Sequence, residues 1–195
     1  GGAIVGDLAS RQSRKLTEPE KRDAEEIFHD SVDYDEVTIT RDSIAATGAA
    51  RTLGNTINLQ PRHFVGDTME LSPEGWLTMV HEMGHVWQYQ NGGLAYIPSS
   101  LIPQIAAGIT GQSRNAAYDW RAAIRAKIPW ERWNAEQQAE CISDYNEALR
   151  RINGGSPTLA DYETVTLAEP YIEKVRRREG APGSKRRRAG ATPEG

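Results

Sequence analysis

Apolar residues recur at helical spacing in several stretches of the chain, and short alternating runs typical of strands lie between the first two. The predicted helices cover residues 17–30, 72–90, 116–127, 134–152 and 158–178. Alternation over 37–40 and 56–59 predicts two strands, the second directly after the turn signal Gly54-Asn55. The apolar stretch 101–109 contains Pro103 and is expected to form a buried helix or a loop lining a cleft. This order favours an α+β, mostly helical domain with a small sheet.

Capping signals define where two of these helices begin. Thr17–Glu20 is a capping box with a proline in the first helical turn. Ser72 places a hydroxyl at an N-cap, followed by Pro73 at the first helical position and by Glu74 near the positive end of the helix dipole. Asn91–Gly93 supplies the stop of the second helix. Both helices are therefore expected to be well formed.

The helix over 72–90 contains the pattern H-E-x-x-H, formed by His81, Glu82 and His85. At about 100° per residue, two positions four apart lie within roughly 40° of each other, so both imidazoles project from one face. They can bind the same Zn²⁺, while Glu82 can reach an attacking water rather than the metal. Gly84 inside a helix costs about 1 kcal/mol relative to alanine, which suggests that another backbone passes close by. The alternative is an ordinary pair of surface or core histidines.

A catalytic zinc site takes three protein ligands and leaves one position for water. The helix over 134–152 carries Glu136, Glu140 and Asp144 at i, i+4 and i+8, which places three carboxylates on one face. Three acids in line repel one another unless a cation compensates them. The pattern favours a face turned toward a metal over a solvated acidic stripe. From the residues alone, Glu136 and Glu140 both remain open as the third ligand.

These motifs resemble those of two groups of zincin metallopeptidases. Glu140–Asp144 is similar to the ligand helix of thermolysin-type gluzincins, in which a glutamate binds zinc and an aspartate one turn later orients a histidine. The longer pattern resembles the metallopeptidase domains attached to, or encoded beside, type VI secretion spike proteins and Rhs-type polymorphic toxins. The second resemblance covers about residues 17–150 and rests on His81–Gln90, Glu136–Gln138, Asp144-Tyr145 and the turn-rich run Gly48–Leu59.

The second resemblance implies a zincin-like fold with one Zn²⁺ per chain, held by His81, His85 and Glu136. Glu140 is the alternative third ligand, and otherwise Glu140 or Asp144 would orient the ligands from outside the coordination sphere. Glu82 would act as the general base toward a metal-activated water. A tyrosine or histidine should stabilise the oxyanion, and each candidate could instead be an ordinary core or surface residue. The candidates are His63, Tyr118 and Tyr145.

The function expected from these motifs is that of a zinc metallopeptidase acting on a peptide or protein substrate. The resemblance adds a bacterial effector or toxin domain that is secreted or delivered into a target cell. Its partners would then be a secretion spike or Rhs-type carrier and a cognate immunity protein. Two alternatives stay open: a zinc amidase acting on cell-wall material, and a non-catalytic module in which zinc stabilises a domain that docks onto a secretion apparatus.

Length and composition predict the domain boundaries and add no further candidate site. A length of 195 residues favours a flexible linker over 1–15, one zincin-like domain over 16–178 and a basic disordered tail over 179–195. From residue 176 onward, seven Lys and Arg stand against two Glu, but nothing elsewhere supports nucleic-acid binding. No apolar run of about 18 residues and no signal-peptide pattern are present. The single cysteine, Cys141, excludes an internal disulfide and is expected to pack in the core.

Overall fold

The computed structural model describes residues 12–41, 51–97 and 117–184, so the expectation for 101–109 lies outside the described residues. The fold is mostly helical with a small mixed sheet, as predicted. Its helices are α2 (Glu18–Phe28), α3 (Pro73–Gly92), α6 (Trp120–Arg125), α7 (Ala135–Asn153) and α8 (Leu159–Arg176). Short 3-10 turns cover Tyr34–Glu36, Pro61–His63, Gly93–Tyr96 and Trp130–Arg132.

The sheet has four strands in the order β1-β2-β4-β3. The strands are β1 (Gln12–Lys15), β2 (Thr38–Arg41), β3 (Arg51–Leu53) and β4 (Thr56–Leu59). Strand β2 runs parallel to β4, and the two outer strands run antiparallel to their neighbours. The predictions of β2 and β4 are confirmed within one residue. Strand β4 alternates half-buried and buried positions, and β2 buries its two central residues.

Two parts of the chain that were expected to be flexible belong to the folded unit instead. Strand β1 lies inside the predicted linker over 1–15 and pairs with β2 from Gln12 to Lys15. Its residues are mostly exposed, so hydropathy gave no sign of a strand that is held by backbone hydrogen bonds at a sheet edge. The predicted boundary at residue 16 was therefore wrong by at least four residues.

The predicted basic tail also begins too early, because residues 179–184 pack against the end of α3. Ala181 is fully buried, and Trp130 donates from Nε1 to the carbonyl of Glu179 at 2.9 Å. A Cβ on Gly92 would lie 1.9 Å from the carbonyl oxygen of Pro182, so only glycine allows this approach. These contacts are made by small residues and backbone atoms, which composition does not distinguish from a solvated tail.

The helix boundaries agree with the capping signals. Thr17 and Glu20 form the predicted capping box, and Ser72 caps α3 by accepting a hydrogen bond from Gly75 N. Asn134 caps α7 in a box with Gln137. Each cap satisfies backbone N–H groups that the first turn of a helix leaves unpaired. The capping signals at Thr17 and Ser72 therefore predicted where α2 and α3 begin.

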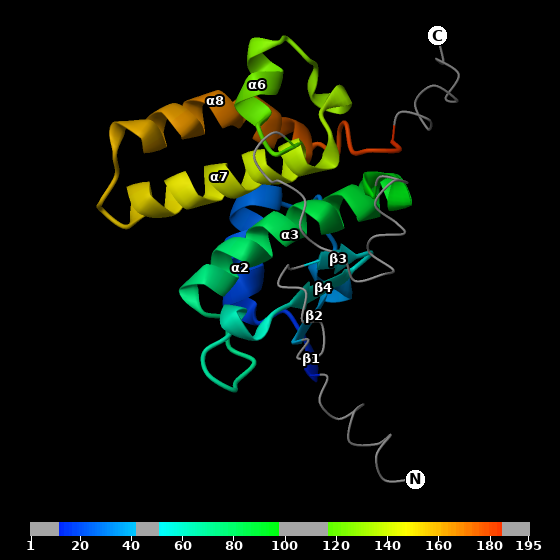
Figure 1. Ribbon diagram of the computed structural model, residues 1–195, viewed down its shortest axis with the longest axis vertical. Helices are drawn as coiled ribbons and strands as arrows, with labels where there is room; N and C mark the ends of the chain where they lie inside the picture. The colour runs from blue at the N-terminus through cyan, green and yellow to red at the C-terminus, as the bar shows by residue number, and fades with distance from the viewer. Residues whose placement is uncertain (1–11, 42–50, 98–116, 185–195) are drawn as a thin grey trace.

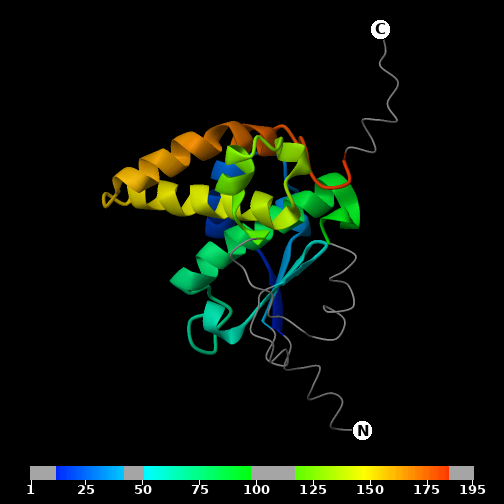
Figure 2. The same ribbon diagram turned by 45° about the horizontal axis from the view of Figure 1, so that its top comes forward.

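Helix α3 lies between the sheet and α7, and α7 lies alongside α8 (Figures 1 and 2). The core between these layers is rich in tryptophan, and Trp87 and Trp130 are fully buried. Trp87 donates from Nε1 to Val175 O at 2.9 Å, which joins α3 to the end of α8. Cys141 is buried on α7, as expected. None of the helices in the described part of the chain has the length and apolarity to cross a membrane.

Candidate metal centre

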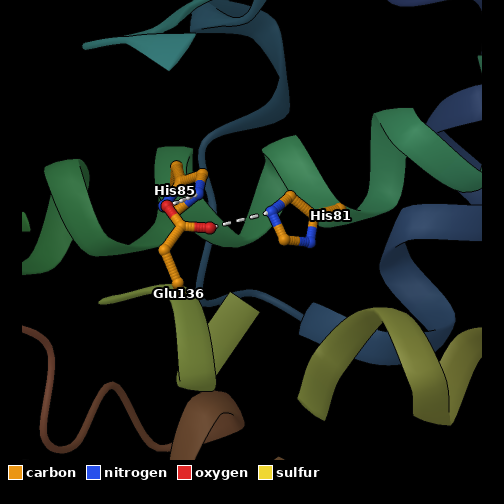
Figure 3. Close-up of side chains that lie close together, drawn as sticks. All are labelled: His81, His85 and Glu136. Carbon is orange, nitrogen blue, oxygen red and sulfur yellow. Dashed lines mark ion pairs between the residues drawn. The ribbon is translucent and has the colours of Figure 1, made fainter. Parts of the chain in front are cut away.

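Helices α3 and α7 bring two imidazoles and a carboxylate together (Figure 3). His81 and His85 lie one turn apart on α3, and Glu136 faces both from the first turn of α7. Glu136 Oε1 lies 3.0 Å from His85 Nε2, and its Oε2 lies 3.3 Å from His81 Nε2. One potential ligand atom from each residue lies within 4.8 Å of the others. The three residues could therefore hold one metal ion.

The close contact between the two helices depends on Gly84. A Cβ added at this position would lie 3.2 Å from Ala139 Cα and 3.3 Å from Ala139 Cβ, which is tighter than ordinary packing. The backbone of α7 thus passes directly over the glycine between the two histidines, as the helix-interior glycine suggested. Glu136 lies one turn before Ala139, so this approach determines how near its carboxylate comes to the imidazoles.

All four ring nitrogens of the histidines face oxygen atoms. On the side away from Glu136, His81 Nδ1 lies 3.2 Å from Glu140 Oε2, and His85 Nδ1 lies 2.7 Å from Gln88 Oε1. A neutral imidazole has one N–H donor and one lone pair, so it can satisfy only one of two flanking acceptors. The arrangement requires a cation on the side of Glu136, either a proton on each ring or a shared metal ion.

The titration behaviour of the site reflects the same charge balance. Burial alone lowers the pKa of His81, but the carboxylates of Glu136 and Glu140 outweigh it and raise that pKa to about 10. Burial opposes a charged His85 as well, yet the charge and contact of Glu136 raise its pKa. For Glu136, burial favours the protonated acid, but the two histidines bring its pKa far below the ordinary range. The pocket therefore stabilises positive charge between the imidazoles and Glu136.

The donor set fits zinc. Two histidines and one glutamate form a ligand combination found in catalytic zinc sites. There the ligand atoms lie about 2.0–2.2 Å from the metal, and three protein ligands leave the fourth position open. Glu136 Oε2 is buried and makes no hydrogen bond, although it lies 3.3 Å from His81 Nε2. An unsatisfied buried carboxylate oxygen is costly unless a cation compensates it. Glu136 is thus the acid that lies on the Nε2 side of both rings, whereas Glu140 contacts only His81 Nδ1.

Glu82 lies next to the first histidine but outside this cluster of three. Its side chain is buried, and Oε2 accepts a hydrogen bond from Thr52 Oγ1 at 2.6 Å. Thr52 lies on the edge strand β3, and its carbonyl accepts a hydrogen bond from the hydroxyl of Tyr96 at 2.8 Å. The sheet therefore holds one oxygen of the Glu82 carboxylate from the side opposite α7.

Each imidazole also stacks on a tyrosine ring. Tyr118 stacks on His81 with ring centroids 5.8 Å apart, and Tyr96 stacks on His85 at 5.7 Å. Of the three predicted oxyanion donors, Tyr118 is therefore the one with a ring against a histidine of the cluster. Tyr145 donates instead to Glu169 on α8, at 2.9 Å.

The remaining predicted site residues have other partners. His63 accepts a hydrogen bond at Nδ1 from Gln60 N, in the turn before α3. Asp144 Oδ2 accepts a hydrogen bond from Trp120 Nε1 at 2.7 Å and lies 3.3 Å from Arg121, so α6 holds this carboxylate. Of the two acids expected to support the ligands, Glu140 is the one in contact with a histidine.

Three further residues shape the site and were not predicted from the sequence: Gln88, Thr52 and Tyr96. Gln88 could have been found, because it lies three residues after His85, and residues at this spacing are neighbours on a helix surface. Thr52 lies 30 residues before Glu82, and Tyr96 lies 44 residues after Thr52. No local sequence pattern links either pair. Only folding of β3 against α3 brings them to the site.

Comparisons with known proteins add no relative, because no family model, curated protein or solved structure matches the chain. The possible metal site of His81, His85 and Glu136 therefore stands on its own geometry and chemistry.

Proposed function

We propose that this chain is a zinc-dependent metallopeptidase in which His81, His85 and Glu136 bind the metal and Glu82 is the general base. The observation that carries the proposal is the convergence of both Nε2 atoms and the Glu136 carboxylate, with a second buried glutamate beside the cluster but not in it. A purely structural zinc site is usually closed by a fourth protein ligand and needs no base. Within the described residues, the cluster has three members.

Zinc bound to such a site would act as a Lewis acid and would lower the pKa of a bound water to about 7. The protein then has to move a proton. Glu82 accepts it from the attacking water and donates it to the leaving amine. The hydrogen bond from Thr52 holds one carboxylate oxygen at 2.6 Å, which leaves the other oxygen for proton transfer. Tyr118 is the best placed of the proposed oxyanion donors, because its ring lies against His81.

The substrate class and delivery route rest on the resemblance of His81–Gln90 and Glu136–Gln138 to metallopeptidase domains of bacterial secretion effectors. We propose a peptide or protein substrate, together with a secretion spike or Rhs-type carrier and an immunity protein as partners. A direct assay on peptides tests the substrate class, because a substrate is selected by the residues of the site and not by the fold.

The test is the substitution Glu82→Gln, which keeps the size and polarity of the side chain but removes its basicity. We expect one zinc per chain in both wild type and variant, and a loss of turnover of about 10²–10⁴-fold on a mixed peptide library. Glu74→Gln is the matched control, because Glu74 is an exposed glutamate in the first turn of the same helix. It should leave both zinc content and turnover unchanged.

The outcomes separate the alternatives. Undiminished cleavage by Glu82→Gln would remove Glu82 from the mechanism. Stoichiometric zinc without cleavage of any peptide would favour a docking module, and cleavage of peptidoglycan fragments in place of peptides would favour a cell-wall amidase. Wild-type protein that binds no zinc would contradict the whole proposal.

A further inference from the structure

We propose that Gln88 is a positioning residue that joins the two ligand-bearing helices and orients His85 so that its Nε2 faces the metal. The inference rests on the proposed zinc site and adds a residue that neither the ligand set nor the proton transfer includes. It follows from a chain of buried side-chain amides that can be oriented in only one way.

The chain begins at two backbone carbonyls, one in the 3-10 turn before α7 and one beyond the end of α8. Gln138 Nε2 lies 3.1 Å from Trp130 O and 2.9 Å from Gly180 O. A carbonyl oxygen can only accept a hydrogen bond, so the NH₂ group of Gln138 must point toward both of them. The side-chain oxygen of Gln138 is therefore the end that faces Gln88.

The same reasoning orients the next amide. Gln88 Nε2 lies 3.0 Å from Gln138 Oε1 and 2.9 Å from Ala135 O, and both of these atoms are acceptors. The NH₂ group of Gln88 is thus used on the side of α7, and its oxygen is directed at His85 Nδ1, at 2.7 Å. Because Oε1 can only accept, Nδ1 must carry the hydrogen, and Nε2 keeps its lone pair for a metal ion.

Burial makes this arrangement strict. The side chains of Gln88 and Gln138 are both completely buried, so no solvent can replace a lost partner. Rotating either amide by 180° would turn its oxygen toward two other oxygen atoms that can only accept, which is expensive in a buried setting. Ala135 directly precedes Glu136, so one side chain holds both the His85 ring and the backbone beside the carboxylate ligand.

The test compares Gln88→Leu with Gln90→Leu. Both substitutions change a glutamine of α3 to leucine, but Gln90 binds Asp33 and Asn55 and makes none of the contacts to the ligands. In competition with a chromophoric chelator, we expect Gln88→Leu to bind zinc about 10–100-fold more weakly than wild type. Gln90→Leu should bind zinc as wild type does.

A second measurement uses the wild-type protein and does not depend on the variant folding. Long-range ¹H–¹⁵N correlation spectra of the zinc-loaded protein should show His85 protonated at Nδ1 and coordinated at Nε2. A residue with a merely structural role would not determine which nitrogen carries the hydrogen. Where Gln88→Leu also folds, its spectra should show exchange or a mixture at His85.

Three results would overturn the inference. The first is coordination of zinc by His85 Nδ1 in wild type, and the second is unchanged zinc affinity in a folded Gln88→Leu. In both cases the proposed function would survive, because wild type would still bind zinc. The third is wild-type protein that binds no zinc, which would remove the proposed function and the inference together.

Discussion

The two sides of the candidate metal centre hold their histidines in different ways. On the side of His85, a buried neutral amide fixes the ring through Nδ1, and a further buried amide anchors it to the backbone. On the side of His81, the partner at Nδ1 is the carboxylate of Glu140, whose side chain is 33% exposed. Each ring also stacks on a tyrosine, and the hydroxyl of Tyr96 is hydrogen-bonded to Gly54 N and Thr52 O, at the end of β3.

The His85 ring is positioned at Nδ1 by neutral amides, whereas the His81 ring is positioned at Nδ1 by a charged carboxylate. At Nδ1, the His85 side relies on the buried amides of Gln88 and Gln138, which carry no charge and do not titrate. The His81 side relies on charge, so its strength changes with protonation and ionic strength. We therefore expect the His85 side to define where the metal sits, and the His81 side to determine how the site responds to conditions.

The largest effect is expected from Glu136→Ala, which removes the group shared by both sides. Loss of a ligand should weaken zinc binding by more than the approximately 10–100-fold expected for Glu140→Ala, which removes only a supporting partner of His81. Zinc content after dialysis and chelator competition would measure both. If Glu140→Ala lost zinc and Glu136→Ala retained it, the alternative third ligand would be correct.

The next effect compares the two stacked tyrosines. Tyr118→Phe keeps the ring on His81 and removes the hydroxyl proposed to stabilise the oxyanion, so turnover should fall by about 10²–10³-fold with zinc affinity unchanged. Tyr96→Phe keeps the ring on His85 and removes hydrogen bonds to Gly54 and Thr52, which should cost about 1 kcal/mol of stability per bond. Peptide turnover and urea unfolding distinguish the two. Equal turnover in Tyr118→Phe and wild type would exclude the Tyr118 hydroxyl from catalysis.

The smallest effect is a pH dependence that originates on the His81 side. The pKa of His81 is raised from 6.5 to about 10, so metal-free folded protein keeps a proton that the unfolded chain has already released. This contribution to stability is complete below pH 6.5 and is lost as pH rises through about 10. Zinc must displace this proton, so its affinity should increase over the same range.

Urea unfolding in the presence of a chelator, at several pH values, measures the stability change, and chelator competition measures the affinity. His81→Gln is the control and should lack the decline in stability between neutral and alkaline pH. Metal-free wild type that became more stable across this range would show that the carboxylates do not hold a proton on His81.

Much of the fold was readable from local signals. The caps at Thr17 and Ser72 predicted helix starts that the structure confirms, because a cap satisfies neighbouring backbone groups and leaves a short sequence signature. The edge strands β1 and β3 were not predicted. Both are short, and β1 is largely exposed, so hydrogen bonds to β2 and β4 define them rather than an apolar pattern of their own.

The candidate metal site could also be predicted in part from local sequence spacing. His81 and His85 share a helix face by their spacing alone, and the line of acids on 134–152 limited the third ligand to two candidates. Choosing between Glu136 and Glu140 required the distance and angle between two helices, which no spacing within one helix contains. The structure places Glu136 against both Nε2 atoms and Glu140 behind His81.

The sequence by itself determined which histidines share a face of α3 and which acids share a face of α7, because helical geometry translates spacing into shared faces. Only the tertiary structure decided which oxygen faces which nitrogen. The approach of α7 over Gly84, the reach of Thr52 from the sheet to Glu82 and the amide chain from Gly180 to His85 all join residues distant in sequence. Such contacts depend on how buried surfaces pack and how buried polar groups find partners, and these are properties of the whole fold.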